Sequence, residues 1–357
     1  MRKKKGIAVL LAVVFTIASL AFLQQLLMPK YMTELYEGAL IEEYYRDKNT
    51  HDVVMVGDCE VYENLSPVTL WREYGITSFI RGSAQQLIWQ SYYLMEETLK
   101  YEKPKVMVFN VLSMKYDKPQ NEAYNRMSLD GMRLSSSKIK AVKASMTEEE
   151  TLGSYIFPLL RYHSRWSELS WEDFKYLFHK DQKSHNGYLM RADIKPLGSL
   201  PTPKKLADYQ FSDICYDYLD KMVKLCKDNG VELVLMKAPT YYPHWYDEWD
   251  QQMVEYAEEN DLLYLNFLDL VEEIGLDFSV DTYDAGLHLN VTGAEKLSVY
   301  FGRILKEEFD LPDRRNDEKE KKTWAEKEKF YDDMKADQYR EIEEYGYPKS
   351  YIGKPEE

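Results

Sequence analysis

The sequence contains little cysteine, and several common functional motifs are missing from it. Only three of its 357 residues are cysteine, no two of them form a CxxC pair, and no GxxxxGK[ST] phosphate-binding loop or internal repeat is present. The formal net charge is -15 at pH 7, with no evident basic patch that could neutralise phosphates. These absences argue against a nucleic-acid-binding protein, and nothing in the sequence supports a metal, nucleotide or redox cofactor.

The spacing of the cysteines does not favour a disulfide. Residues 208–228 show the three- and four-residue apolar spacing of a helix, and Cys215 and Cys226 both lie on it. At 1.5 Å per residue their Cα atoms would be about 16 Å apart, well beyond the limit of about 7 Å for a disulfide. We therefore expect these two to be core thiols, which leaves Cys59 free.

The N-terminal residues 1–30 predict a membrane anchor. A basic cluster at residues 2–5 precedes an almost wholly apolar run over 7–23 that continues to Met28. This length suits a spanning helix of about 20 residues, and the basic cluster would keep the N-terminus in the cytoplasm and the rest of the chain outside. The alternative is a cleaved signal peptide, because Ser19 and Ala21 form a small-x-small site.

Five short apolar runs alternate with helical patterns in the remainder of the chain. The runs predicted to be strands are residues 51–56, 76–80, 105–109, 231–236 and 262–267, and the helical patterns between them are 86–101, 205–227 and 244–259. Such alternation predicts a parallel sheet covered by helices on both faces. Ligands of such sheets lie at the carboxyl ends of the strands. Cys59, Gly82 and Asn110 each follow a predicted strand and should meet there.

Other segments flank or interrupt this α/β domain, which we assign to residues 51–118 and 205–311. We expect a helical stalk over 31–50 and a charged appendage over 312–357. The helix of the appendage is predicted to be solvated rather than part of the core, and the alternative is that it docks on the domain or on a partner. Residues 119–204 are an aromatic-rich insertion with helical patterns over 135–145, 148–161 and 171–179. The insertion is either a lid whose aromatic rings stack on sugars or an ordinary helical cap with its own small core. From it, His163 and Arg165 could reach a substrate.

Two segments carry the residue types of nucleophilic catalysis. The motif GDCE at residues 57–60 follows the first strand, where a sharp turn can hold a nucleophile out of the sheet. Residues 281–296 place Asp284 and His288 in a turn-rich segment before the last helix, for which Thr292 is the expected N-cap. A lone cysteine is more often a small buried apolar residue, and this alternative stays open for Cys59.

Together these two segments resemble the SGNH or GDSL hydrolase family over residues 50–118 and 205–309. The resemblance is to its membrane-anchored, extracytoplasmic branch, which includes cell-wall O-acetyl esterases, alginate-type acetyltransferases and the D-alanyl transfer protein of teichoic acid synthesis. It implies a flavodoxin-like, three-layer α/β fold with a parallel five-stranded sheet. The sequence departs from the family where Cys59 replaces the usual serine and where Val108 replaces a glycine. Asp284 also lies four residues before His288 rather than three, with the extra residue expected to bulge at Gly286.

The resemblance also implies a role for each site residue. Cys59 would attack an acyl carbonyl, His288 would take and return the proton, and Asp284 would fix the imidazole tautomer. The oxyanion would be held by the backbone N–H groups of Cys59 and Gly82 and by the side chain of Asn110. As alternatives, Gly82 only permits a turn, Asn110 only caps a strand end, and His288 is a core histidine.

The activity implied is that of an esterase or acyltransferase acting on acyl groups, chiefly O-acetyl, of a cell-envelope glycan or polymer. A membrane-bound O-acyltransferase is the partner that the resemblance suggests. The rival hypothesis is a catalytically inactive SGNH-fold protein that binds glycan or serves as a scaffold. A thiol redox role is weaker because no resolving cysteine lies near Cys59 in the sequence. No residue can be assigned to substrate binding.

Overall fold

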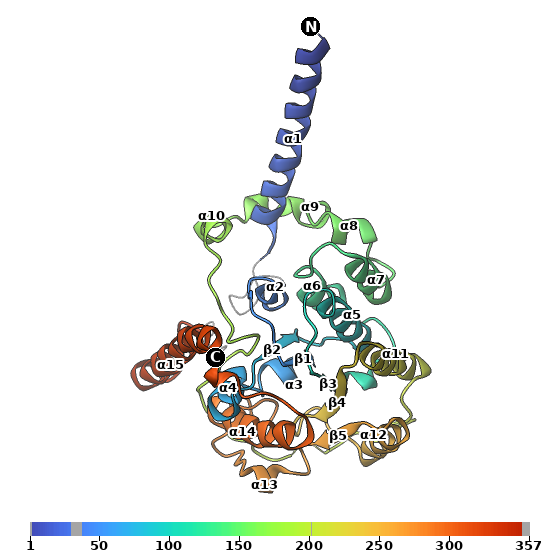
Figure 1. The fold of residues 1–357 in the computed structure, drawn as a ribbon, viewed down its shortest axis with the longest axis vertical. Helices are drawn as coiled ribbons and strands as arrows, with labels where there is room; N and C mark the ends of the chain where they lie inside the picture. Colours follow the sequence, from blue (N-terminus) through green and yellow to red (C-terminus); the bar gives the residue numbers. More distant parts are fainter. Residues whose placement is uncertain (1, 30–37, 201, 352–357) are drawn as a thin grey trace.

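The computed structural model describes residues 2–29, 38–200 and 202–351. At its centre is a parallel five-stranded sheet with the strand order β2-β1-β3-β4-β5 (Figure 1). Its strands are β1 (Val53–Gly57), β2 (Ser78–Gly82), β3 (Val106–Asn110), β4 (Glu232–Lys237) and β5 (Leu263–Asn266). This is the flavodoxin-like strand order, in which the winding direction reverses between β1 and β3. The predicted α/β fold with a five-stranded parallel sheet is confirmed.

Helices cover both faces of the sheet because the inner strands are apolar throughout. Val54 and Val56 point into one core with α5 (Ile88–Thr98), α11 (Asp213–Asn229) and α12 (Asp247–Asn260). Val53 and Met55 point into the opposite core with α4 (Pro67–Tyr74) and α14 (Val291–Glu308). The two-residue alternation of a strand thus divides the run over 53–56 between two layers. The point where the winding direction reverses, between β1 and β3, therefore has helices on both sides of the sheet.

The observed helices differ from the predicted ones in several places. The pattern over 148–161 is split at Pro158 into α8 (Leu152–Ile156) and α9 (Leu159–Tyr162), because proline lacks the N–H that would continue the first helix. The N-cap of α14 is Asn290, whose side chain accepts a hydrogen bond from the N–H of Gly293 at 3.2 Å, and not Thr292. Helices α4 and α6 (Glu122–Leu129) had not been predicted.

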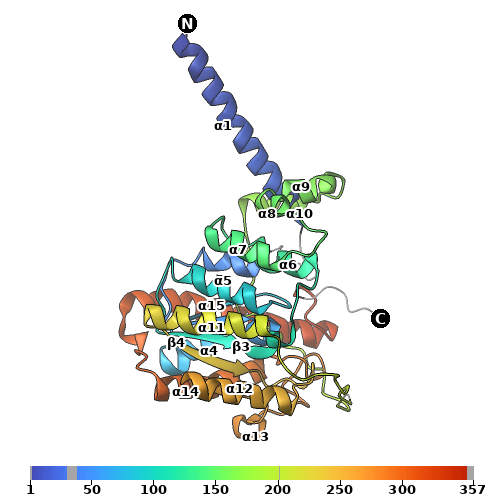
Figure 2. The same cartoon turned by 90° about the vertical axis from the view of Figure 1, so that its right-hand side faces the viewer.

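The N-terminal helix α1 (Arg2–Leu27) projects away from the α/β domain (Figure 2). Its segment Lys4–Leu27 is long and apolar enough to cross a membrane, and 0% of its most apolar window is buried. A signal sequence near the N-terminus would meet the same description by length and composition.

The first part of the insertion forms a small apolar core together with α2 (Ala39–Tyr44) and α5. Residues 31–37 of the expected stalk lie outside the described residues, and α2 follows them. This helix is built into the domain rather than standing apart as a stalk, because Ile41 packs in a small apolar cluster with residues of α5, α6, α7 (Ser136–Ser145) and α8. An insertion core of this kind matches the helical-cap interpretation.

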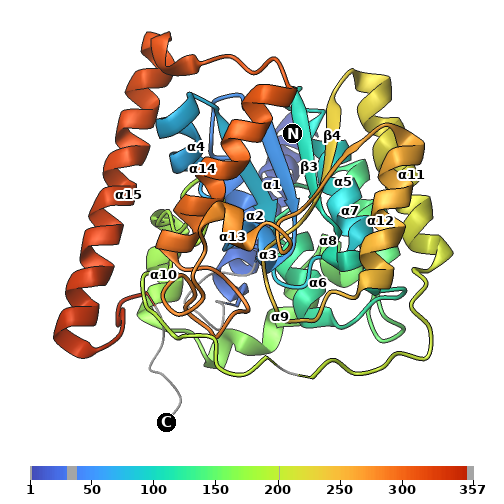
Figure 3. The ribbon, with the colours of Figure 1, turned by 90° about the horizontal axis from the view of Figure 1, so that it is seen from below.

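The prediction of a solvated C-terminal helix is wrong. Helix α15 (Glu318–Tyr345) does form, but it lies along the side of the domain beside α4 (Figure 3). Trp324 and Tyr331 are 0% exposed and belong to the same core cluster as Trp71. The indole rings of Trp71 and Trp324 stack with their centroids 5.0 Å apart. The many charges of α15 lie on its remaining faces.

Candidate active site

Cys59 stands at the end of β1, at the start of the one-turn helix α3 (Cys59–Tyr62). Asp58 caps this helix by accepting a hydrogen bond from the N–H of Glu60 at 3.1 Å. Gly57 is required because a Cβ there would lie 2.5 Å from Val61. The tight turn therefore presents a half-buried thiol at the carboxyl edge of the sheet, as the sequence predicted.

His288 is held by the turn that precedes α14. One oxygen of the Asp284 carboxylate accepts from the backbone N–H of His288 at 2.7 Å, and the other lies 2.6 Å from ring Nδ1. Ala285 and Gly286 have φ angles of 66° and 92°, in the left-handed region. These two residues accommodate the extra residue between acid and histidine, so that Asp284 still reaches the ring. A carboxylate at Nδ1 favours the tautomer in which Nε2 can accept a proton.

The segments that carry Cys59 and His288 are in direct contact although they are far apart in the sequence. The side-chain oxygen of Asn64, just after α3, accepts a hydrogen bond from the N–H of Leu289 at 2.7 Å. The thiol of Cys59 lies within interaction range of the His288 imidazole. Because Nδ1 is engaged by Asp284, Nε2 is the ring nitrogen available to the thiol. Nε2 is buried and makes no hydrogen bond of regular geometry with any described residue. Catalytic hydrogen bonds are often loose before substrate binds.

The environment of Cys59 favours the thiol over the thiolate. Burial raises the pKa of Cys59 to about 11, and the charge of Asp58 acts in the same direction. The imidazole of His288 lowers the pKa of Cys59, which partly offsets the burial. Because α3 is a single turn, its dipole adds little. To act as a nucleophile, a thiol in this environment would need a base that removes its proton.

A second carboxylate, which sequence reasoning missed, faces the same imidazole. Glu63 Oε2 lies 3.6 Å from His288 Nδ1. Burial acts to lower the pKa of His288, but the charges of Glu63 and Cys59 and the bond to Asp284 outweigh it and raise this pKa well above its ordinary value. Glu63 follows Cys59 by four residues, which is one helical turn, and this spacing could have identified it.

Substituting Glu63 by glutamine is expected to move the pH dependence of activity. Loss of the negative charge removes a group that stabilises the imidazolium, so the pKa of His288 should fall and the acidic limb of the kcat/KM profile should shift to lower pH. The pKa of Cys59 should fall as well, because Glu63 raises it. The measurement is a pH profile of ester hydrolysis with Glu73→Gln, an exposed glutamate of α4, as the matched control. An unchanged acidic limb would mean that Glu63 does not act on the base.

The residues expected at the oxyanion hole lie at the same edge of the sheet. Gly82 pairs with Gly57 in the β1–β2 ladder, and a Cβ on it would lie 3.0 Å from the Gly57 carbonyl oxygen. The amide nitrogen of Asn110 donates to Asp58 Oδ1 and Glu60 Oε2, at 3.1 Å each. Both hydrogens of that amide are thus used within the protein. Asn110 could bind an oxyanion only by exchanging one of these bonds.

A buried ion pair underlies the nucleophile turn. Glu60 is 1% exposed, and its Oε1 lies 2.8 Å from Nζ of Lys237 at the end of β4, which is itself 0% exposed. Lys237 also donates to Thr240 Oγ1 at 2.9 Å. Removing one partner of such a pair leaves an uncompensated charge, which typically costs about 3–5 kcal/mol. The pair fixes α3 to the central strands. Its only sequence signal was the position of Lys237 near the strand end.

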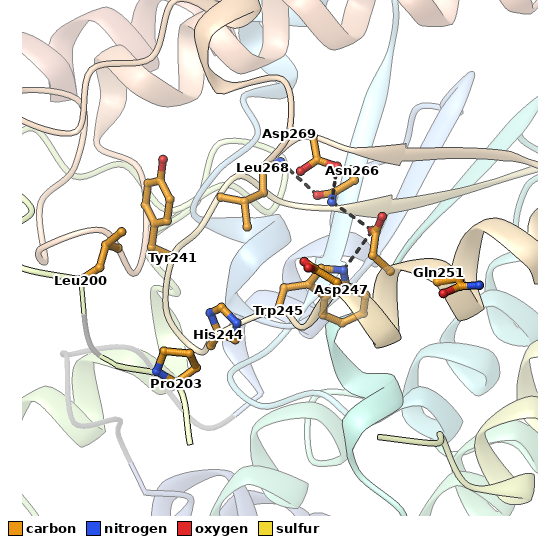
Figure 4. Close-up of a pocket in the computed structure, with 11 residues that line it drawn as sticks. Leu200, Pro203, Tyr241, His244, Trp245, Asp247, Gln251, Asn266, Leu268 and Asp269 are labelled. Atoms are coloured by element: carbon orange, nitrogen blue, oxygen red, sulfur yellow. Dashed lines mark hydrogen bonds between the residues drawn. The ribbon is translucent and has the colours of Figure 1, made fainter. Parts of the chain in front are cut away.

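The edge of the sheet also carries a pocket beyond β4 and β5. Its volume is about 470 Å³, which is the size of a small-molecule site. Figure 4 shows its wall, which is formed by Leu200, Pro203, Tyr241, His244, Trp245, Asp247, Asp250, Gln251, Asn266, Leu268 and Asp269. The N–H of Tyr241 donates to the carbonyl of Gly286 at 3.0 Å. The pocket wall, which includes His244, thus adjoins the loop that carries His288.

The insertion reaches the site through its extended end. The N–H of Leu189 donates to the carbonyl of Tyr62 at 2.8 Å. The backbone N–H of Lys195 donates to the carbonyl of Thr282, and the carbonyl of Lys195 accepts from the N–H of Ala285. The expectation that His163 and Arg165 could reach a substrate is not supported. Arg165 Nη1 instead donates to the carbonyl of Leu27 at 2.9 Å, at the end of α1.

Among the described residues, no group of three or more His, Cys, Asp or Glu side chains is arranged to hold a metal ion.

Comparisons with known proteins yield structural likeness only. No protein-family model matches the sequence, and no curated protein matches it. A candidate acylhydrolase from Bacteroides fragilis is 12% identical, with 73% of this chain and 89% of that chain covered and a TM-score of 0.35. A GDSL-like lipase from Bacteroides thetaiotaomicron is 10% identical, with coverage of 76% and 99% and a TM-score of 0.33. These solved structures are proteins that the chain is similar to, at values that establish no family membership.

Proposed function

We propose that this protein is a membrane-anchored esterase or acyltransferase of the SGNH type that works through an acyl-Cys59 intermediate. The observation that carries the proposal is the convergence of Cys59 and His288, with Asp284 bound to the opposite nitrogen of the imidazole at 2.6 Å. A nucleophile, a base and a group that orients the base form the constellation of acyl transfer. Two turns position all three side chains: the turn after β1 holds Cys59, and the turn before α14 holds Asp284 and His288.

The proposed reaction has two half-reactions. His288 Nε2 takes the thiol proton while Cys59 Sγ attacks the ester carbonyl, and the imidazolium then gives that proton to the departing alcohol oxygen. A thioester on Cys59 remains. In the second half, His288 takes a proton from water or from an acceptor hydroxyl, whose oxygen attacks the thioester and releases the thiol. Water as acceptor gives hydrolysis, and a sugar or polymer hydroxyl gives acyl transfer.

The backbone N–H groups of Cys59 and Gly82 are the proposed oxyanion donors. They belong to neighbouring strand ends, because β1 and β2 pair in parallel up to Gly57 and Gly82. Donors of this kind each contribute about 10²- to 10³-fold to the rate. Asn110 would join them only after releasing Asp58 or Glu60.

We propose a cell-envelope glycan or polymer as the acyl donor or acceptor. The 470 Å³ pocket beside the His288 loop combines the rings of Trp245 and Tyr241 with the carboxylates of Asp247 and Asp269. Aromatic faces and carboxylate acceptors suit a polyhydroxylated chain. In this proposal α1 anchors the protein, the domain is extracytoplasmic, and a membrane-bound O-acyltransferase supplies acyl groups.

The test is detection of the acyl enzyme by intact mass. Brief incubation with p-nitrophenyl acetate should add one acetyl group, and peptide mapping should place it on Cys59. Cys215→Ala is the matched control, because it removes a buried thiol of α11 and should leave the adduct unchanged. His288→Ala should prevent the adduct. Acetylation of other residues, with Cys59 unmodified, would refute the covalent route.

A catalytically inactive scaffold is the second candidate function. It is favoured by the pKa of Cys59, which burial raises to about 11 and which leaves little thiolate at neutral pH. If the wild type forms no adduct and hydrolyses no ester while it binds envelope glycans, the scaffold function replaces the catalytic one.

A further inference from the structure

Large apolar side chains are exposed together on the last helices of the insertion. Within the 22 residues from 157 to 178, six of them are exposed to solvent: Phe157, Leu160, Trp166, Trp171, Phe174 and Phe178. Trp171 is 79% exposed and Phe178 is 85% exposed. A folded protein seldom leaves so many large apolar groups uncovered unless the surface contacts a partner or a membrane.

Helix α10 (Trp171–Phe178) shows that the exposure follows a pattern. Trp171, Phe174 and Phe178 are spaced by three and four residues and therefore share one face of the helix. The rings of Trp171 and Phe174 lie 6.4 Å apart. Asp173, which lies between them in the sequence, is buried and bonds to the N-cap residue Ser170. Asp173 is the only buried residue of the helix, and the face that carries the three rings is uncovered.

This apolar surface surrounds the end of α1. Figures 1 and 2 both show α8, α9 and α10 gathered where α1 meets the rest of the protein. Side chains of α1 are exposed up to Leu23, whereas Leu26 and Leu27 are only 6% and 5% exposed. The carbonyl of Leu27 also accepts the hydrogen bond from Arg165. The uncovered part of α1 thus ends where the aromatic surface begins.

The length of α1 is close to the thickness of a bilayer, so this boundary would lie at a membrane surface. Its 24-residue apolar segment Lys4–Leu27 would be about 36 Å long at 1.5 Å per residue. The hydrocarbon core of a bilayer is about 30 Å thick. A helix whose Lys4 and Lys5 lie at one surface of the membrane would emerge from the other surface near Leu27. Tryptophan and phenylalanine favour that depth, the interface between headgroups and acyl chains.

We infer that residues 157–178 form a membrane platform that lies on the same bilayer that α1 spans. The exposed rings enter the interfacial region of the leaflet where α1 ends. The inference rests on the anchoring in the proposed function, but not on its chemistry. It places the rest of the protein close to the membrane, at a distance set by the platform helices α9 and α10.

Tryptophan fluorescence provides the test on the full-length protein. The chain has seven tryptophans, of which Trp166 and Trp171 are exposed on the platform, while the other five are buried: Trp71, Trp89, Trp245, Trp249 and Trp324. Helix α1 contains none. In vesicles of phosphatidylcholine brominated on its acyl chains, emission should fall relative to unbrominated vesicles. The double variant W166F/W171F should lose this quenching. The control W249F should keep it, because Trp249 lies in the α/β core.

Vesicle flotation separates the possible outcomes. If the protein floats with the vesicles and brominated lipid does not quench it, the platform is refuted while anchoring stands. If it does not float, anchoring and the platform fail together. Equal quenching in the wild type and the double variant would also overturn the platform, because the quenched groups would lie elsewhere. Concentration-dependent burial of both tryptophans without lipid would assign the surface to a second copy of the chain.

Discussion

Replacement of Cys59 by alanine is expected to lower the rate of ester hydrolysis by at least about 10³-fold, because removal of an enzyme nucleophile leaves only the contribution of binding and oxyanion donors. The thiol is presented at the start of α3 beside the only imidazole that a carboxylate orients within the described site. The measurement is release of p-nitrophenol from an acetyl ester at saturating and limiting substrate. Cys226→Ala, in the buried core of α11, is the matched control.

Cys59→Ser extends this test. Serine is the usual nucleophile of the family that the sequence resembles, and its hydroxyl can be activated by the same base. A serine variant that retains hydrolysis, together with an inactive alanine variant, would show that the site supports acyl transfer independently of the sulfur. An alanine variant with the wild-type rate would remove Cys59 from the mechanism.

The Asp284→Asn variant is expected to lose about 10³- to 10⁴-fold in kcat, with the fold unchanged. The carboxylate accepts from both the backbone N–H and the ring Nδ1 of His288. An amide that donates to Nδ1 would place the imidazole proton on Nε2, and the ring could then no longer accept the thiol proton. Steady-state kinetics and circular dichroism together measure this effect. Asp277→Asn, at an exposed aspartate preceding the same loop, is the control.

The amount of activity lost in Asp284→Asn will also show whether Glu63 helps to orient the His288 ring. Its carboxylate is 3.6 Å from the same ring nitrogen. If Glu63 takes over the orientation of the ring, Asp284→Asn will lose much less activity than expected, and only the double variant with Glu63→Gln will show the full loss. A double variant no worse than wild type would exclude both carboxylates from the orientation of the base.

The fold could be predicted because its signals are local. The run over Val53–Val56 has the composition and length of a buried strand, and Gly57 marks its end. The alternation of such runs with helical patterns then leaves few topologies, because parallel crossovers are right-handed. The positions of Cys59, Gly82 and Asn110 at one edge followed from this arrangement. The proximity of His288 came from the resemblance, since spacing along the chain carries no information on it.

The rest of the site depends on side chains from distant segments. The bond between Asn110 and Glu60, and the pairing of Glu60 with Lys237, involve three different elements and leave no periodic pattern. The buried face of α15 did leave one. Trp324, Tyr331 and Gln338 are separated by seven residues each and are all buried. The high charge of the segment obscures this repeat, because charged residues surround each of the three buried positions in the sequence.

The stacking of Trp71 against Trp324 also determines when the domain can finish folding during its synthesis. Residues of the first two crossovers enter the ribosomal exit tunnel long before α15 is translated, so one wall of their core stays open to solvent until residue 331 has emerged. Nascent chains that stall before that point would display Trp71 and its neighbours to chaperones and proteases. All five strands end by Asn266, so the completion of α15 covers the last open wall of a sheet whose strands have already been made.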